Sequence, residues 1–430
     1  MDKTLSAGST FTRSARLAWA EARALTGFGM VGLTGVLMLA TLPALSQERF
    51  LPAASAVVLA SSVHTAGGRD SSLRALDQAW RAKPQDLSLA LAYARAVFTL
   101  GLNEGDLRWF GSAKAALSPW WRATDLPADG LFMRGLVKQG FHDFDGGLQD
   151  INQAIALAPG RAEFWSWRFS LHLLKADMAA ARQDAETIAR LFGQQEGRIY
   201  NAVLLYRTGQ ASDAVKLLNQ SIRLADFQDA SSQVWLSFHL GEALRAANQP
   251  EQAMALWRQR LQAHPQSHLL RLSLAELLNQ QGQYREAKAT ATAHAATGTS
   301  NLTDALLMQA LLASRGLKAP DEVSLADQIA ARLQSQALRQ ESLIERPKLI
   351  YQIAYGRDVA AGLALSIDNW QLQQEPPDAL LFAQAALSLN QARVAEPVVK
   401  WVEATGYTDP QLGPLIAQLK AHPTWSRGSR

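Results

Sequence analysis

Metal binding by a pair of histidines is a chemistry that residue spacing can indicate. His264 and His268 are four residues apart, a spacing that would place two side chains on one helix face and suit a metal ion. Pro265 lies between them and lacks the amide hydrogen that a continuous helix uses. We therefore expect these histidines on either side of a turn, as solvated loop residues without a metal.

A second polar cluster lies in the segment FHDFDGG, residues 141–147. His142, Asp143 and Asp145 are close together there, but Asp and Gly are also the usual residues of turns. The segment supplies too few spaced oxygens for a calcium loop. We expect a solvated turn in which Phe144 packs inward.

Common catalytic signatures are missing from the sequence. The patterns GxxxxGK[ST], GxSxG, SxxK and HExxH, which serve phosphate binding, nucleophilic catalysis and zinc hydrolysis, do not occur. Only scattered Asp, Glu and His remain as candidate chemical groups. The expectation is a protein that is not an enzyme, without a cofactor and without a metal.

Tryptophan is frequent, with 12 residues in the chain. Such rings could stack on sugars, but large residues also fill the space between packed helices, so we expect most of them in the core. Two adjacent residues cannot both face inward on one helix, so one of the Trp120–Trp121 pair should be partly exposed. The tryptophans that cluster early in the chain are Trp109, Trp120, Trp121, Trp165 and Trp167.

Composition narrows the class of protein. The 430 residues are 48% hydrophobic and 19% charged, and Ala, Leu and Gln dominate over β-branched residues, which favours helix throughout. The net charge is +4, of which residues 1–46 carry +2, and the remainder has no run of Lys and Arg. Nucleic acid is therefore an unfavoured partner. Without cysteine, disulfides and thiol chemistry are excluded, while export stays open.

The N-terminus has the three parts of a secretory signal. Lys3, Arg13, Arg16 and Arg23 precede the uncharged run FGMVGLTGVLMLATLPAL, residues 28–45, and small residues then offer a cleavage site before residue 47. An uncleaved signal anchor has the same flanks, so residues 1–46 are a signal peptide or an anchor. Either alternative predicts a periplasmic chain, with membrane contact only through residues 28–45 if they are retained.

The remainder of the chain repeats. LGEALRAANQPEQAMALWRQRLQAHP, residues 240–265, recurs 34 residues later, with Ala275 in the place of Gly241 and Ala287 in the place of Ala253. Such a period is typical of stacked helix pairs. Small residues near the start of each second helix form a ladder with steps of 34, 33, 39, 34, 39, 35 and 34: Gly147, Ala181, Ala214, Ala253, Ala287, Ala326, Ala361 and Ala395.

The ladder predicts how each pair packs. A small residue of the first helix, such as Gly135 or Gly241, should lie against the second helix, whose own small residue lets the axes approach. A large residue one turn later, Ile151, Leu218 or Trp257, should fill the remaining space. One pair cannot bury both of its faces, so neighbouring pairs must stack.

This pattern resembles the tetratricopeptide repeat (TPR). The segments 103–121, 142–155 and 363–376 are similar to exported bacterial TPR proteins of unassigned function. The resemblance implies an all-α fold, a right-handed α-solenoid of helix hairpins behind the N-terminal apolar segment. We expect a linker over 47–70, about eight to nine degenerate repeats over 71–410, and a capping helix and tail over 411–430.

The first helices of such pairs line the concave face, where a partner segment commonly lies. The mixture of aromatic, amide and arginine side chains there suits hydrogen bonding to a protein segment. The expected partner-binding groove contains Val203, Tyr206, Arg207, Trp235, Phe238, Glu242, Arg245, Leu272, Glu276, Asn279 and Gln280.

The sequence thus predicts a non-catalytic protein–protein interaction scaffold in the bacterial periplasm or cell envelope. Its partners would be proteins, such as a membrane protein or an envelope complex. The alternative is an accessory protein for carbohydrate binding or polysaccharide export that uses the clustered tryptophans.

Overall fold

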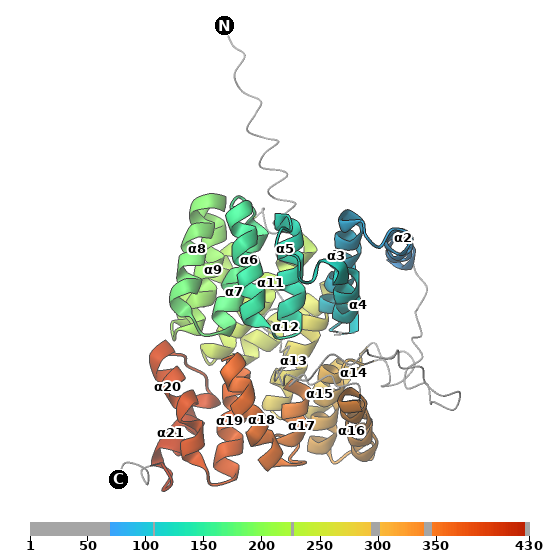
Figure 1. Ribbon diagram of the computed structural model, residues 1–430. Coiled ribbons are helices and arrows are strands. Elements are labelled where there is room, and N and C mark those ends of the chain that lie inside the picture. Colours follow the sequence, from blue (N-terminus) through green and yellow to red (C-terminus); the bar gives the residue numbers. More distant parts are fainter. Residues whose placement is uncertain (1–68, 106–107, 225–227, 294–301, 339–345, 426–430) are drawn as a thin grey trace, which may run out of the picture.

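The computed structural model describes residues 69–105, 108–224, 228–293, 302–338 and 346–425 (Figure 1). The regular structure within these ranges is entirely helical. Its first half consists of α2 (Arg69–Ala82), α3 (Leu87–Glu104), α4 (Arg108–Ala116), η1 (Ser118–Trp120), α5 (Ala128–Gly140), α6 (Phe144–Leu157), α7 (Ala162–Leu174), α8 (Met178–Phe192), α9 (Gln194–Arg207), α10 (Ala211–Ser221), α11 (Ala230–Ala246) and α12 (Pro250–Ala263).

The second half continues the same arrangement, and most helices pack mainly against their neighbours in the chain. The fold is therefore an α-solenoid of helix pairs, as predicted. Its helices are α13 (His268–Gln280), α14 (Tyr284–Thr292), α15 (Asp304–Leu317), α16 (Glu322–Leu338), α17 (Arg346–Gln352), α18 (Val359–Leu372), α19 (Pro376–Ser388), η4 (Ala392–Ala395), α20 (Glu396–Thr405) and α21 (Leu412–Ala421).

The small-residue ladder marks where the two helices of a pair cross. Gly147 lies under Gly135, and a Cβ on either glycine would be 3.0 Å from the carbonyl oxygen of the other. Trp257 covers Gly241 and donates its indole N–H to the carbonyl oxygen of Ser237 at 3.0 Å. These contacts confirm the predicted packing of small residue against small residue, with a large residue beside them.

One step of the ladder is wrong by a residue. Most ladder residues are the fourth of their helix, as Gly147 is in α6 and Ala253 in α12. In α18 the fourth residue is Gly362, where a Cβ would overlap Ile353, while the predicted Ala361 is half-buried. The pair α17–α18 departs most from the repeat pattern, so neighbouring small residues left its register ambiguous.

The turns within the pairs share one backbone conformation. The residue five positions before a ladder residue has a positive φ in five successive pairs, with values of 61°, 57°, 80°, 58° and 70°. Glycine or asparagine adopts this conformation at low cost, but two pairs use other residues. The five residues are His142, Ala176, Gly209, Asn248 and Gly282.

The first helices are buried on every side. Residues 130–137 of α5, 235–241 of α11 and 268–275 of α13 are each buried without interruption. Seven or eight residues complete about two helical turns, so no face of these helices remains open to solvent. A solenoid with an open concave face would expose one side of its first helices; here that side is covered.

The first helices cover one another, since α3 packs on α5, α9 on α11, and α13 on both α11 and α3. The C-terminal block, helices α17–α21, residues 346–421, lies against the turns and helix ends of these pairs. Helices α3–α14 form an arc, and Figure 1 shows the block, orange to red, beneath helices α5–α9 of that arc. The two ends of the arc also contact each other, because Gly105 after α3 lies directly against the ring of His268 at the start of α13. The solenoid therefore folds back onto the turns of its own earlier pairs.

No helix among the described residues is long and apolar enough to cross a membrane. The predicted signal or anchor, residues 1–46 with the apolar run 28–45, lies outside the described residues, as does most of the predicted linker.

The crossing at Gly241 gives a test of the packing. Replacing Gly241 with Ala places a methyl group inside the Trp257 indole, so we expect the free energy of unfolding to fall by about 1–3 kcal/mol. Gly111→Ala is the control, because Gly111 of α4 has open space around it and Ala favours helix by about 0.5–1 kcal/mol. Chemical denaturation of both variants measures the difference; a stabilised Gly241→Ala chain would contradict the crossing.

Candidate functional site

The predicted groove lies at a seam between the arc and the C-terminal block. The backbone N–H of Gln374 donates to the carbonyl oxygen of Leu174 at 2.8 Å, which joins the start of α19 to the end of α7. Further along, Gly209 leaves no space for a side chain because the carbonyl group of Gly406 lies against it. The backbone of the C-terminal block therefore lies directly against the backbone at the turns of successive pairs.

Buried charges meet at this seam. Arg207 at the end of α9 is 0% exposed, and its Nη1 lies 3.8 Å from Oε1 of Glu375. Arg346 of α17 reaches the other carboxylate oxygen of Glu375 at 3.1 Å and Asp378 at 3.2 Å. Gln373 donates to Asp378 at 2.8 Å. Two cations and two carboxylates thus share one enclosed space, and one of those cations comes from the arc.

A second ion-paired group lies beside the first. Arg245 of α11 pairs with Glu242 at 2.8 Å and approaches Asp409 of the C-terminal block at 3.6 Å. The phenol of Tyr407 donates to the same Asp409 at 3.4 Å. The segment between α20 and α21 therefore contributes a carboxylate to the arc, as the segment before α19 does.

Burial changes the protonation of two carboxyl groups here. It raises the pKa of Glu276 on α13 to about 7, against the attraction of Arg346, and Glu242 adds to the rise. Burial likewise raises the pKa of Glu375 to about 7, although Arg346 and Arg207 oppose it. Both groups consequently change charge near neutral pH, inside a region that holds the arc and the block together.

One buried hydrogen bond between side chains joins α9 to α11. Tyr206 and His239 are hydrogen-bonded at 2.9 Å between the phenol oxygen and Nδ1. Burial lowers the pKa of His239 to about 3, so the ring is neutral at physiological pH. This pair packs the first helices together and offers no group to a ligand.

The eleven residues of the predicted groove fall into three classes of exposure. Most are buried in the packed interior, out of a partner's reach: Val203, Tyr206, Arg207, Trp235, Phe238 and Leu272. Four are half-buried at the seam: Glu242, Arg245, Glu276 and Asn279. Gln280 alone of the eleven is exposed. Their role as partner contacts stays a prediction.

The sequence missed the residues that face this groove. Glu375, Asp378 and Asp409 complete the ion pairs, but they come from units far along the chain. A repeat period predicts which side chains share a face, whereas it says nothing about which distant unit returns to cover that face. No local signal distinguishes these carboxylates from solvated ones.

The histidine predictions need two corrections. His268 is 6% exposed rather than solvated, and its Nε2 lies 2.8 Å from the hydroxyl of Thr303. His142 is also buried, and burial together with Arg346 lowers its pKa well below the usual value. Turns usually face solvent, which is why the sequence predicts solvated histidines here; these turns instead pack against other parts of the solenoid. Phe144 does pack inward, as predicted.

The early tryptophans do not form one exposed platform. Trp167 is buried in the core at 1% exposure, out of reach of a sugar. Trp120 and Trp121 are both half-buried, so the partial exposure expected for one of them applies to both. A short 3₁₀ turn, not a regular helix, holds this pair, which lets neighbouring rings share the surface.

Two further indoles are already bonded within the chain. Trp109 donates its N–H to Glu104 at 3.1 Å, and Trp165 donates to the carbonyl oxygen of Pro159 at 2.8 Å. A sugar hydroxyl would have to replace those acceptors. The carbohydrate alternative therefore depends on Trp120 and Trp121.

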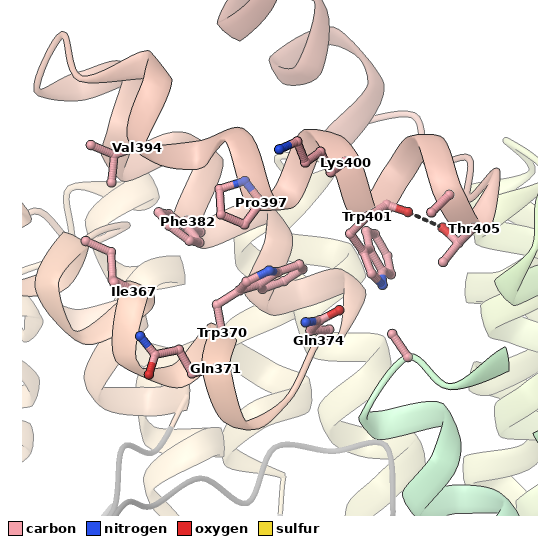
Figure 2. A pocket seen from close by; sticks show the side chains of 12 residues that line it. Ile367, Trp370, Gln371, Gln374, Phe382, Val394, Pro397, Lys400, Trp401 and Thr405 are labelled. Atoms are coloured by element: carbon pink, nitrogen blue, oxygen red, sulfur yellow. Dashed lines mark hydrogen bonds between the residues drawn. The ribbon is translucent and has the colours of Figure 1, made fainter. Parts of the chain in front are cut away.

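An apolar groove of about 530 Å³ opens where the C-terminal block meets the turn after α7. Figure 2 shows Trp370 from α18 and Trp401 from α20 beside the same space, with Gln374 near them. The two indoles pack edge to face, with centroids 5.7 Å apart. The groove suits a bulky apolar side chain. Its lining is Ala176, Ile367, Trp370, Gln371, Gln374, Phe382, Val394, Pro397, Lys400, Trp401, Ala404 and Thr405.

Comparisons with known proteins show similarity only in the arrangement of the backbone. The sequence matches no protein-family model, and no curated protein is significantly similar to it. Among solved structures, a Rap protein complexed with competence and sporulation factor has a TM-score of 0.46 and 12% identity, over 82% of this chain and 97% of that one.

Two other solved structures are similar to about the same extent. A monomeric mutant of IFIT1 with Gppp-AAAA has a TM-score of 0.45 and 12% identity, covering 78% of this chain and 76% of its own. Yeast Tom70 has a TM-score of 0.40 and 13% identity, covering 84% and 86%. The assignment of the solenoid rests on the helix pairs themselves.

The raised pKa of Glu276 predicts a pH dependence of stability. A carboxyl whose folded pKa is about 7, above the usual 4.5, stabilises the fold fully below pH 4.5, and this contribution is lost as the pH rises through 7. Glu276→Gln should therefore flatten the fall in unfolding free energy over this range, by up to about 1.4 kcal/mol per pH unit. Denaturation at several pH values measures the slope.

The control for this experiment is Glu251→Gln on the exposed start of α12. It removes a carboxylate without touching the seam, so it should leave the slope unchanged. Identical slopes for the wild-type chain and Glu276→Gln would contradict the assigned environment of Glu276.

Proposed function

We propose that this chain is a non-catalytic scaffold that binds an extended protein segment on the inner face of its solenoid, in the bacterial periplasm or cell envelope. The inner face means the end of α7 at Leu174 and the sides of α9, α11 and α13 that carry Arg207, Arg245 and Glu276. Stacked helix pairs support this proposal because they present a long curved surface built from rigid elements.

One observation carries the proposal: the inner face already holds polypeptide. Gln373 and Glu375 of the same chain have extended backbone, with ψ angles of 146° and 151°. Next to them, the N–H of Gln374 bonds to a carbonyl oxygen of the arc, and Glu375 faces Arg207. The face thus recognises both a main chain and its carboxylates, which is how peptide-binding surfaces combine affinity with specificity.

Export is supported by the N-terminal sequence. The basic region, the apolar run 28–45 and the small residues after it are the parts of a secretory signal. A chain without cysteine also tolerates an oxidising compartment without forming disulfides. The proposed partner is accordingly a protein of the cell envelope.

Site-specific cross-linking tests this function. A photo-reactive amino acid at Gln280, which is exposed beside Asp409 and Arg245, should give a discrete protein adduct in intact envelopes. The same amino acid at Gln262, exposed on the second helix α12, is the matched control and should give none. Mass spectrometry of the adduct identifies the partner; equal labelling from both positions, or none from Gln280, would refute binding at the inner face.

A further inference from the structure

The C-terminal block packs around a hydrophobic core of its own. The buried apolar residues of this core come only from the segment 346–421, while most of those of the arc form a separate cluster. Tyr351 of α17 belongs instead to a third cluster, with Leu272 and Ala275 of α13. A unit with its own core can move as a body relative to its neighbour. Members of the block's core include Leu349, Leu363, Trp370, Phe382, Val398 and Trp401.

Apolar contacts join this block to the arc through Leu372, Ala176 and Tyr351. Polar contacts join it to the inner face: the ion pair of Arg207 with Glu375, the ion pair of Arg245 with Asp409, and the main-chain hydrogen bond of Gln374. The glycine contact between the turns adds close packing without a large apolar side chain. Each of these contacts is one that an unrelated polypeptide segment could supply.

We propose that residues 373–411 are a built-in occupant of the inner face, which a partner displaces by offering an extended segment with carboxylates of its own. This inference rests on the proposed function and names the chemistry of its partner. Arg207 and Arg245 are the recognition cations of the arc. Glu375 and Asp409 are the carboxylates that the incoming segment replaces.

The energetics of buried ion pairs favour exchange over simple opening. Leaving Arg207 enclosed without a carboxylate is costly, because a buried charge needs a partner of opposite sign. Replacing one carboxylate with another leaves the number of ion pairs unchanged. The inner face is therefore expected to be closed in the free chain and to open only in exchange for an acidic segment.

A covalent lock tests the displacement. The chain has no cysteine, so Lys175→Cys and Gln374→Cys introduce the only two thiols, on either side of the hydrogen bond between Leu174 and Gln374. Oxidation should close this pair and hold the block on the arc, and reduction should release it. Failure of the pair to close would contradict the docked arrangement.

The probe is a fluorescent peptide with the sequence of residues 371–379, QLQQEPPDA. In fluorescence anisotropy, the reduced Lys175→Cys/Gln374→Cys chain should bind it, and oxidation should weaken binding at least about tenfold. A Glu375→Gln chain, whose own segment lacks the carboxylate, should bind it about tenfold more tightly than the wild type does. A control peptide with Arg in place of Glu375 should not bind.

The outcomes separate this inference from the function on which it rests. Equal binding of the peptide by oxidised and reduced chains, or no binding by either, would overturn the displacement. If the Gln280 adduct also forms equally in both states, the scaffold stands without its built-in occupant. Absence of the adduct in every state rejects the scaffold itself. Circular dichroism of Glu375→Gln excludes unfolding as the cause of altered binding.

Discussion

The structure depends on one constraint: a single pair of helices cannot bury both of its faces. Small residues at the crossing, such as Gly135 on Gly147, bring the two axes of a pair close together, and the next pair must then cover what remains exposed. Repeating this step bends the stack, until α17–α21 meet the turns of the earlier pairs. The same need for cover thus shapes each pair and closes the whole solenoid.

The return of α17–α21 onto the earlier pairs explains why charged groups lie in the interior. The ends of α9 and α11 carry Arg207 and Arg245, and the returning block must offer them carboxylates, since an enclosed cation without a partner is strongly unfavourable. Such pairs add little net stability compared with apolar packing, but they fix which segment fits. In the proposed function, they select for an acidic occupant of the inner face, whether it belongs to this chain or to a partner.

The sequence predicted local packing well and long-range contacts poorly. The ladder found Ala181, Ala214 and Ala253, all of which are fully buried, because a small residue is required wherever two helix axes cross. The same analysis assigned His142 and His268 to solvated turns, and both are buried under parts of the chain that are distant in sequence. Turn chemistry is visible locally, whereas the surface against which a turn packs is not.

The sequence by itself determined the helix pairs, their spacing and the residues at their crossings, because each follows from contacts within about 40 residues. It also predicted which side chains point to the inner face. Only the tertiary structure decided that Glu375 and Asp409 return to pair with Arg207 and Arg245. Small rotations between successive pairs add up over the stack. Their sum brings the last units back onto earlier ones, and no single repeat encodes that sum.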